Sequence, residues 1–454
     1  MNETIVKSVI KKFNGDSVSP ILMFRRLKGN HKYFFESSRQ FQRSGEYSYM
    51  GVNPIKSFIG GDGYIEEINH STKETIIHKG DPLELLHELI PNVSAQADFD
   101  FIGGLVGYVG YDSMLEMKAE TENEIKLPLL QFDLYETSII YSHITDEVYV
   151  IHNEIIRTYE EANVDDLIEQ ILHGDKAISK PFKFEEFSCH VTDEQFDERV
   201  SRAKLAIEQG KAVQLFLTKR YSALFQGDAF EMYRQLRKEL LAPNMFYLEY
   251  PTFTLMGVSP ESIIKIKGKK VFVSPITGAR PRGATPREDI KMELNLLQNS
   301  REVNAHNILV DSTMADIETI CMPGTVQLIE YMKPVQFKHS IRLTTEIEGI
   351  LKERLYPIDA LSLLIPPASS SGVPKRAAAR IVTEIEETPR EFSGGVLGYI
   401  SLNRNINFTL LQQAMIIKDE RAYIQAGANI LNDSLEVDAH LEIRKKLKAF
   451  LNIE

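Results

Sequence analysis

A run of short strands connected as hairpins is the feature that most constrains the fold of this chain. The segments Thr252–Met256, Ile263–Lys267 and Lys270–Val273 follow one another with only short connections. Such strands pair antiparallel, because a parallel pair needs a crossover of a dozen or more residues. The sequence therefore predicts an α+β protein with mainly antiparallel sheets rather than a doubly wound parallel sheet.

Helix signals punctuate the second half of the chain. Thr192 and Gln195 form the pattern of a capping box, and apolar residues then recur at helical spacing until Gly210. A strand at Val213–Leu217 follows. Further predicted helices are Glu288–Val310, Arg376–Glu386 and Leu435–Leu451. In the first part we expect strands at Lys32–Ser37, Tyr47–Val52, Leu130–His143 and Glu147–His152, and helices at Asp81–Leu89 and Thr158–His173.

Length and composition exclude several classes of protein. The 454 residues suffice for one large or two ordinary domains, and a Lys-rich link predicts a division into 1–175 and 185–454. The formal charge of −12 and the lack of a long basic run argue against nucleic-acid binding. No apolar stretch approaches the ~20 residues that cross a bilayer, and no signal peptide is evident. We therefore expect a cytoplasmic protein with no membrane partner.

The two cysteines, Cys189 and Cys321, are expected to be free thiols. Neither stands in the glycine-flanked turn that would present a nucleophile. We therefore expect no glutamine-hydrolysing domain in this sequence.

The run from Ser274 to Gly283 predicts an anion-binding element. Gly278 and Gly283 allow the backbone to approach a ligand closely, and Arg280 and Arg282 offer planar groups suited to carboxylate or phosphate. By itself the run is also compatible with a solvated basic hairpin.

This run resembles the "PIAGTRPRG" signature of the chorismate-utilising enzymes, and of their anthranilate synthase component I branch most of all. Four further segments match in the same order: Gly257–Glu261, Ser371–Lys375, Gly394–Tyr399 and Gln425–Ala428. The resemblance is looser at Phe35–Ser38, Tyr47–Gly51 and Gly103–Tyr108. It implies helices packed on two stacked, mainly antiparallel sheets, with the active site in a cleft between layers. It also implies conversion of chorismate and ammonia to anthranilate and pyruvate, the first committed step of tryptophan biosynthesis.

The resemblance assigns catalytic positions. Glu261 matches the general acid that protonates the leaving hydroxyl. Gln214 stands where water-using relatives carry a lysine base, and Thr277 where the para-aminobenzoate branch places a nucleophilic lysine. Both therefore favour ammonia and the anthranilate branch. The implied substrate-binding positions are Gly278, Ala279, Tyr399, Gln413, Gly427, Ala428, Asn429 and Lys375.

A magnesium site is also implied, from two glutamate pairs at i, i+3 spacing on two helices. Glu302 and Glu442 match one member of each pair, and Ala305 and Ala439 replace the others. Because magnesium commonly uses one or two carboxylates with water and substrate oxygen, Glu302 and Glu442 are the predicted ligands.

Other positions depart from the family pattern. Arg342 lies where the family has a catalytic histidine, and an arginine does not give up its proton at neutral pH. Gln413 replaces an arginine that clamps a substrate carboxylate, and Asn429 replaces a glycine. Two alternatives therefore remain open: an aminodeoxychorismate synthase-type enzyme, and a homologue that keeps the fold as a binding or regulatory subunit.

The resemblance finally implies two partners. A separate glutamine amidotransferase subunit, anthranilate synthase component II, would supply ammonia in a hetero-oligomer. L-tryptophan is the implied effector, because Glu36-Ser37 resembles the "LLES" strand and Leu241–Met245 the effector loop. The expected effector contacts are Ser37, Leu241, Ala242 and Pro243.

Overall fold

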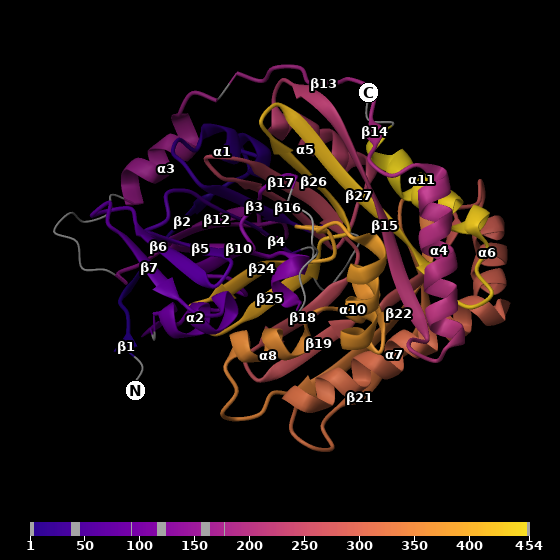
Figure 1. The fold of residues 1–454 in the computed structure, drawn as a ribbon. Helices are drawn as coiled ribbons and strands as arrows, with labels where there is room; N and C mark the ends of the chain where they lie inside the picture. Colours follow the sequence, from indigo (N-terminus) through magenta and orange to yellow (C-terminus); the bar gives the residue numbers. More distant parts are fainter. Residues whose placement is uncertain are drawn as a thin grey trace.

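Two large β-sheets with helices along their outside form the body of the protein in the computed structural model (Figure 1). The structure describes residues 4–37, 46–91, 93–115, 124–155, 164–176 and 178–451. Neighbouring strands run antiparallel in both sheets, and the described part of the chain has one parallel pair, between β1 (Thr4–Ile5) and β8 (Val93–Ser94). The predicted α+β fold of stacked antiparallel sheets is confirmed.

The larger sheet has 13 strands within the described ranges. Their order is β13 (Lys183–Phe184), β15 (Gln214–Gln226), β27 (Arg421–Ile430), β26 (Gln413–Lys418), β17 (Thr254–Ser259), β16 (Asn244–Glu249), β3 (Lys32–Glu36), β4 (Tyr47–Gly51), β11 (Thr137–Ser142), β12 (Glu147–Asn153) and β2 (Ser8–Asn14). Two short strands, β14 (Ser188–Cys189) and β23 (Gly372–Val373), also pair with β15.

The second sheet has 12 described strands. Their order is β20 (Ile276–Pro281), β22 (Ser340–Ile350), β19 (Lys270–Ser274), β18 (Ser262–Lys267), β25 (Ile406–Leu410), β24 (Val396–Ser401), β9 (Gly104–Val109), β10 (Leu130–Tyr135), β5 (Lys56–Gly61), β6 (Tyr64–Asn69) and β7 (Thr75–Lys79), and β21 (Gln327–Gln336) pairs with β22. Strands β9 and β24 pair with each other, as do β3 and β16. Both sheets thus contain strands from before residue 175 and from after residue 185. The division of the chain into regions 1–175 and 185–454 stays a prediction from the sequence.

Two predicted strand arrangements are wrong because the chain changes sheets. Strand β17 pairs with β16 and β26, whereas β18 lies in the other sheet, paired with β19 and β25. Pro260, which stands at this change, has no N–H to continue a ladder. The predicted strand Leu130–His143 likewise divides at Glu136 into β10 and β11, which lie in different sheets. Residues 130–143 contain neither Gly nor Pro, so the sequence there carries no turn signal that would mark such a change.

Several helices begin at a residue whose side chain caps the first turn. The described helices are α1 (Pro20–Arg26), α2 (Pro82–Leu89), α3 (Val164–His173), α4 (Asp193–Glu208), α5 (Ala229–Glu239), α6 (Pro286–Gln298), α7 (Ser300–Ile320), α8 (Pro357–Leu364), α9 (Ala368–Ser371), α10 (Lys375–Glu386) and α11 (Glu436–Leu451), with a 3₁₀ turn at Tyr111–Met114. The Thr192/Gln195 capping box is present at α4. The predicted helix Glu288–Val310 is instead two helices, because Asn299 ends α6 and its side chain caps α7 by accepting from the Glu302 N–H.

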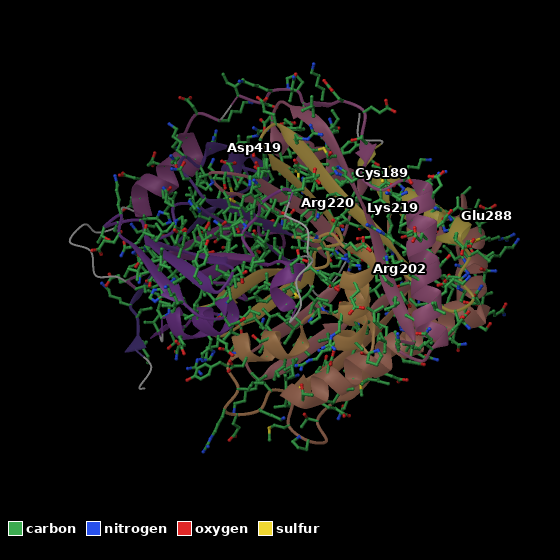
Figure 2. The ribbon with its side chains drawn as sticks, viewed as in Figure 1. Cys189, Arg202, Lys219, Arg220, Glu288 and Asp419 are labelled. Atoms are coloured by element: carbon green, nitrogen blue, oxygen red, sulfur yellow. The ribbon has the colours of Figure 1, made fainter. Side chains whose placement is uncertain are left out.

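Aromatic side chains fill the space between the sheets. Tyr33 and Tyr49 come from the larger sheet, and Tyr108 and Tyr399 from the other, in one buried cluster. Outside this layer, Lys219 of β15 is buried and donates to Asp193 at the start of α4 over 2.6 Å (Figure 2). The sheets are thus held by an aromatic interior, and β15 is tied to its covering helix by an ion pair.

Candidate functional site

Glu261 lies at the point where the chain passes from one sheet to the other. Its backbone carbonyl accepts hydrogen bonds from the Thr409 hydroxyl (2.6 Å), the Ser259 hydroxyl (3.2 Å) and the Leu410 N–H (3.3 Å). Three donors to one carbonyl fix the backbone here and therefore the direction of the Glu261 side chain.

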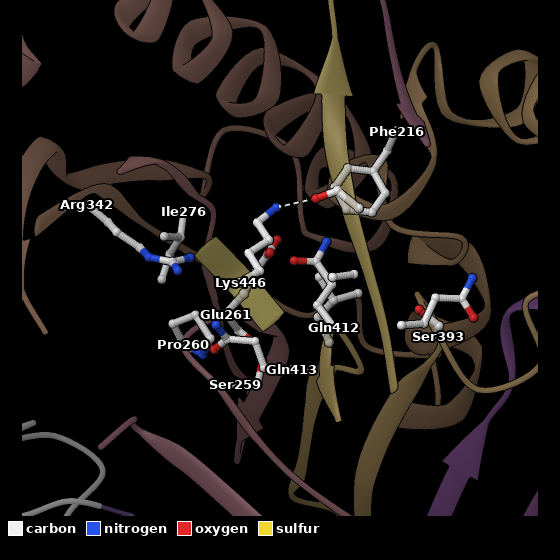
Figure 3. Close-up of a pocket in the computed structure, with 14 residues that line it drawn as sticks. Phe216, Ser259, Pro260, Glu261, Ile276, Arg342, Ser393, Gln412, Gln413 and Lys446 are labelled. Carbon is white, nitrogen blue, oxygen red and sulfur yellow. Dashed lines mark hydrogen bonds between the residues drawn. The ribbon is translucent and has the colours of Figure 1, made fainter. Parts of the chain in front are cut away.

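Glu261 lines a cavity of about 40 Å³ to which strands of both sheets and α11 contribute (Figure 3). The lining residues are Phe216, Ser259, Pro260, Glu261, Ile276, Arg342, Ser393, Leu410, Gln412, Gln413, Gln425, Ala426, Gly427 and Lys446. Polar and charged groups from four strands and one helix thus converge on a small volume.

Burial makes Glu261 a weak acid. The residue is 8% exposed, and burial raises the pKa of its carboxyl to about 7, against the opposing effects of the Ser369 hydroxyl and the Arg342 guanidinium. A carboxyl with a pKa near neutrality retains a proton that it can donate. The geometry therefore suits the general-acid role predicted for Glu261.

Two cations face this acid. The Lys446 ammonium donates to Glu442 Oε1 and to the Gly427 carbonyl, both over 2.7 Å, and lies 5.2 Å from the centre of the Phe216 ring (Figure 3). Burial lowers the pKa of Arg342, and the charges of Glu442 and Glu261 oppose that shift. The Nε of Arg342 donates to the Ser340 hydroxyl over 3.4 Å, and within the described ranges no carboxylate forms an ion pair with this guanidinium.

The predicted substrate-binding residues divide into two groups. Gln413 and Gly427 line the cavity, whereas the other six do not: Gly278, Ala279, Tyr399, Ala428, Asn429 and Lys375. Tyr399 packs in the interior with its ring centre 4.8 Å from that of Phe101 and the two rings tilted by 47°, and Lys375 forms an ion pair with Asp316 over 2.9 Å. Their roles in substrate binding stay predictions.

Gln214 is held beside the cavity rather than in its lining. Its amide nitrogen donates to Asn429 Oδ1 over 2.8 Å across the β15–β27 pair. Its amide oxygen is buried and meets no hydrogen-bond donor in the described part of the chain. That oxygen is an acceptor that a small donor such as ammonia could satisfy.

Thr277 belongs to a hydrogen-bonded chain with a residue that the sequence did not single out. The Thr277 hydroxyl lies 2.6 Å from His306 Nδ1, and His306 Nε2 lies 2.7 Å from the Thr345 hydroxyl. Burial lowers the pKa of His306 to about 4, so the imidazole is neutral at physiological pH. The position of His306 one helical turn after Glu302 is the signal that could have identified it.

The predicted metal ligands do not fit a magnesium ion. Glu302 accepts from Arg280 over 2.8 Å, and Glu442 accepts from Lys446 over 2.7 Å, so each carboxylate is neutralised by a cation of the protein. Ala439 is 4% exposed and packs in a core cluster. Among the residues described, the cluster of three metal-type side chains is elsewhere, at His31, His70 and Asp133.

The predicted effector residues come together at one end of a strand pair. Glu36 of β3 faces Met245 of β16, which brings Ser37 and the adjacent Leu241, Ala242 and Pro243 to the same end. The Ser37 hydroxyl is buried and has no hydrogen-bond partner among the residues that the structure describes. Ser38, part of the matched motif, lies outside the described residues.

The site also contains residues that sequence reasoning missed. Phe216, Gln412 and Lys446 line the cavity. Lys446 follows Glu442 by four residues on a helix, a spacing that brings side chains together and was available in the sequence. Phe216 and Gln412 carry no such signal.

Comparisons with known proteins agree with this architecture. A family model described as chorismate binding enzyme matches residues 30–452. Anthranilate synthase component 1 of Lactococcus lactis subsp. lactis is 30% identical over 458 residues, covering 98% of this chain and 99% of that protein.

Solved structures extend the likeness. The crystal structure of anthranilate synthase component I from Streptococcus pneumoniae TIGR4 matches with a TM-score of 0.77 at 28% identity, over 97% of this chain and 98% of that one. MenF, the menaquinone-specific isochorismate synthase of Escherichia coli, matches with a TM-score of 0.75 over 99% and 95%. At 12% identity, this second likeness concerns the fold alone.

In the described ranges, no helix has the length and apolar character needed to cross a membrane.

Four observations lead to one conclusion about the family of this chain. They are the ordered motifs, the two stacked sheets, the buried acid at their junction and the match over residues 30–452. The chain belongs to the family of chorismate binding enzymes.

Proposed function

We propose that this protein converts chorismate and ammonia to anthranilate, pyruvate and water. The observation that carries the proposal is Glu261, a buried carboxyl with a pKa of about 7 in a cavity that also receives two cations. In this proposal Glu261 protonates the leaving hydroxyl, while Arg342 and Lys446 bind the carboxylates of the substrate. These residues supply an acid and the charge needed to hold a dianion.

Ammonia is the proposed nucleophile because the residues described as lining the cavity include no free amine base. Lys446 lines the cavity, but its ammonium is engaged by Glu442 and Gly427. The unpaired amide oxygen of Gln214 is an acceptor for an ammonia N–H. Thr277 has no amine, which disfavours the aminodeoxychorismate alternative.

We further propose a separate glutamine amidotransferase as the ammonia source. An exposed apolar stripe on α6, at Ile290, Leu294 and Leu297, supports docking of a protein partner. The relatives that match over nearly the full length are named as component 1, which agrees with a second component. L-tryptophan remains the proposed effector, and the buried, unpaired Ser37 hydroxyl supports a ligand at that place.

One observation favours a second candidate, a non-catalytic binding or regulatory subunit. The cavity of about 40 Å³ holds only a few water molecules, because Arg342 and Lys446 occupy its walls. Turnover then requires these side chains to move when the substrate enters.

A turnover assay with chorismate and excess ammonium tests the proposal. We expect a fluorescent product, anthranilate, from the wild-type chain without any partner. Glu261→Gln serves as the inactive control. Release of a non-aromatic aminated product would favour the aminodeoxychorismate alternative, and chorismate binding without any product would favour the regulatory subunit.

A further inference from the structure

Glu302 is already engaged by a cation whose own position is fixed. Arg280 donates to Glu302 Oε1 (2.8 Å), to Asn295 Oδ1 (2.8 Å) and to the Ala279 carbonyl (3.0 Å). Two nitrogens of the planar guanidinium make these bonds, Nη1 to Glu302 and Ala279 and Nε to Asn295, which limits the freedom of the side chain. A metal ion at Glu302 would have to displace this ion pair.

At Glu442 a protein cation takes the place that a metal would need. The Lys446 ammonium lies 2.7 Å from both Glu442 Oε1 and the Gly427 carbonyl oxygen. A carboxylate and a carbonyl are the hard oxygen ligands that magnesium binds. One ammonium therefore occupies the oxygen pair that this end of the site could offer to a metal.

The positions at which the family pattern would place the second glutamate of each pair carry alanine, and Asp438, four residues before Glu442, is paired with Arg301 over 3.7 Å. Ala305 lies three residues after Glu302, and Ala439 three residues before Glu442. Ala439 packs against the core in a cluster with Ile443. Of the two predicted glutamate pairs, each helix thus keeps one member, and both of these are paired with a cation of the protein.

Arg342 is the second positive charge at the cavity. It lines the same space as Glu261 and Lys446, from strand β22 rather than from α11 (Figure 3). Its guanidinium can bind a carboxylate through two parallel hydrogen bonds. A divalent cation would be repelled by this group, which no carboxylate of the described residues pairs, whereas a carboxylate of the substrate would be attracted.

We infer that this chain binds the carboxylates of its substrate without a divalent metal ion, using Lys446 and Arg342 as the positive charges. The inference rests on the proposed function, because that function supplies the dianionic ligand. Arg280 acts separately, by neutralising Glu302. The cation that the family resemblance implies is thereby replaced by side chains of the protein.

Calorimetry on the full chain tests both parts of the inference. We expect magnesium chloride alone to show no saturable binding at concentrations up to about 10 mM. We expect chorismate to bind with the same affinity, within about twofold, in EDTA and in magnesium. Saturable magnesium binding below about 1 mM, or loss of chorismate binding in EDTA, would overturn the inference.

Variants test whether Arg342 and Lys446 bind the carboxylates of the substrate. Arg342→Met and Lys446→Met keep an apolar stem, and each should weaken chorismate binding by roughly ten- to hundredfold, the effect of losing one charged hydrogen bond. Lys445→Met, at the exposed neighbouring position, is the matched control and should leave binding unchanged. Thermal unfolding of each variant confirms that it folds. Unchanged binding in both cavity variants would contradict the assignment.

The outcomes separate this inference from the proposed function. Chorismate binding in EDTA without anthranilate formation supports the inference and refutes the proposed function. Anthranilate formation that requires magnesium supports the proposed function and refutes the inference. Absence of chorismate binding in both buffers overturns both.

Discussion

The Thr409 hydroxyl donates a 2.6 Å hydrogen bond to the backbone carbonyl of Glu261. This bond joins β25 to the residue at which the chain leaves one sheet for the other. It therefore links the position of the proposed general acid to the packing of the two sheets.

Thr409→Val should lower turnover through the position of Glu261. Small displacements of a catalytic group lower rates strongly, and we expect a loss of about tenfold to a hundredfold in kcat with little change in KM. The altered environment of Glu261 should also shift the pH at which the rate falls. Thr383→Val, which removes a similar bond inside α10, is the control and should change neither quantity. An unchanged pH profile in Thr409→Val would contradict this role.

Glu261→Gln should abolish the acid step while chorismate still binds. General acids contribute typically 10² to 10⁴ in rate, so we expect a loss of about that size in kcat. Because the pKa of Glu261 is about 7, the wild-type rate should fall as the pH rises through 7 and the carboxyl loses its proton. Initial rates of anthranilate fluorescence measure both effects. The exposed Glu353→Gln is the control. Wild-type turnover in Glu261→Gln would exclude Glu261 as the acid.

Gly278→Ala should destabilise the protein more than Gly268→Ala. Both glycines have a positive φ, 65° and 61°, so both variants incur backbone strain of about 1–2 kcal/mol. At Gly278 the new Cβ would also lie 3.0 Å from Leu296 Cδ1 and 3.2 Å from Glu302 Oε2, whereas at Gly268 it meets no atom within 4 Å. Crowding adds about 1–3 kcal/mol at Gly278 alone. Equal unfolding free energies in urea would disprove the tight packing around Glu302.

Burial of neutral His306 should lower the free energy of unfolding in mild acid. Its pKa is lowered from 6.5 to about 4 by burial, so between these values the unfolded chain binds a proton that the folded chain does not. The contribution of His306 is therefore complete above pH 6.5 and is lost as the pH falls toward 4.

The comparison of wild type with His306→Gln measures this effect. The difference between their unfolding free energies should narrow by on the order of 3 kcal/mol between pH 7 and pH 4. His173→Gln, at an exposed position, should show no such trend. A difference independent of pH would mean that His306 is not buried in its neutral form.

Glutamine should not serve as nitrogen donor for the isolated chain. Burial raises the pKa of the Cys321 thiol to about 11, which leaves almost no reactive thiolate at neutral pH. Cys189 is exposed at the edge of the larger sheet, and its Sγ lies 3.0 Å from the Val191 carbonyl (Figure 2). We expect no glutamate release from glutamine. Release that persists in a Cys189→Ser/Cys321→Ser double variant would indicate a contaminating glutaminase, and release that the double variant abolishes would refute the prediction.

Local signals determined much of the fold. The Thr192/Gln195 capping box, the apolar spacing behind it and the alternation of strands with helices were sufficient to predict α4, α10 and α11, because these depend on neighbouring residues. The ordered motifs were sufficient to predict the family. Glu261 could be identified because its role depends on a short segment that includes Ser259 and Pro260.

Contacts between distant segments decided the rest. The sequence contains Glu302, Glu442, Arg280 and Lys446, but which cation neutralises which carboxylate follows from how β20 packs on α7 and α11 on β27. Spacing along a helix predicts only that side chains share a face. A free carboxylate can bind a metal and an ion-paired one is already neutralised, so the tertiary structure, rather than the motif, determined the chemistry that these glutamates can perform.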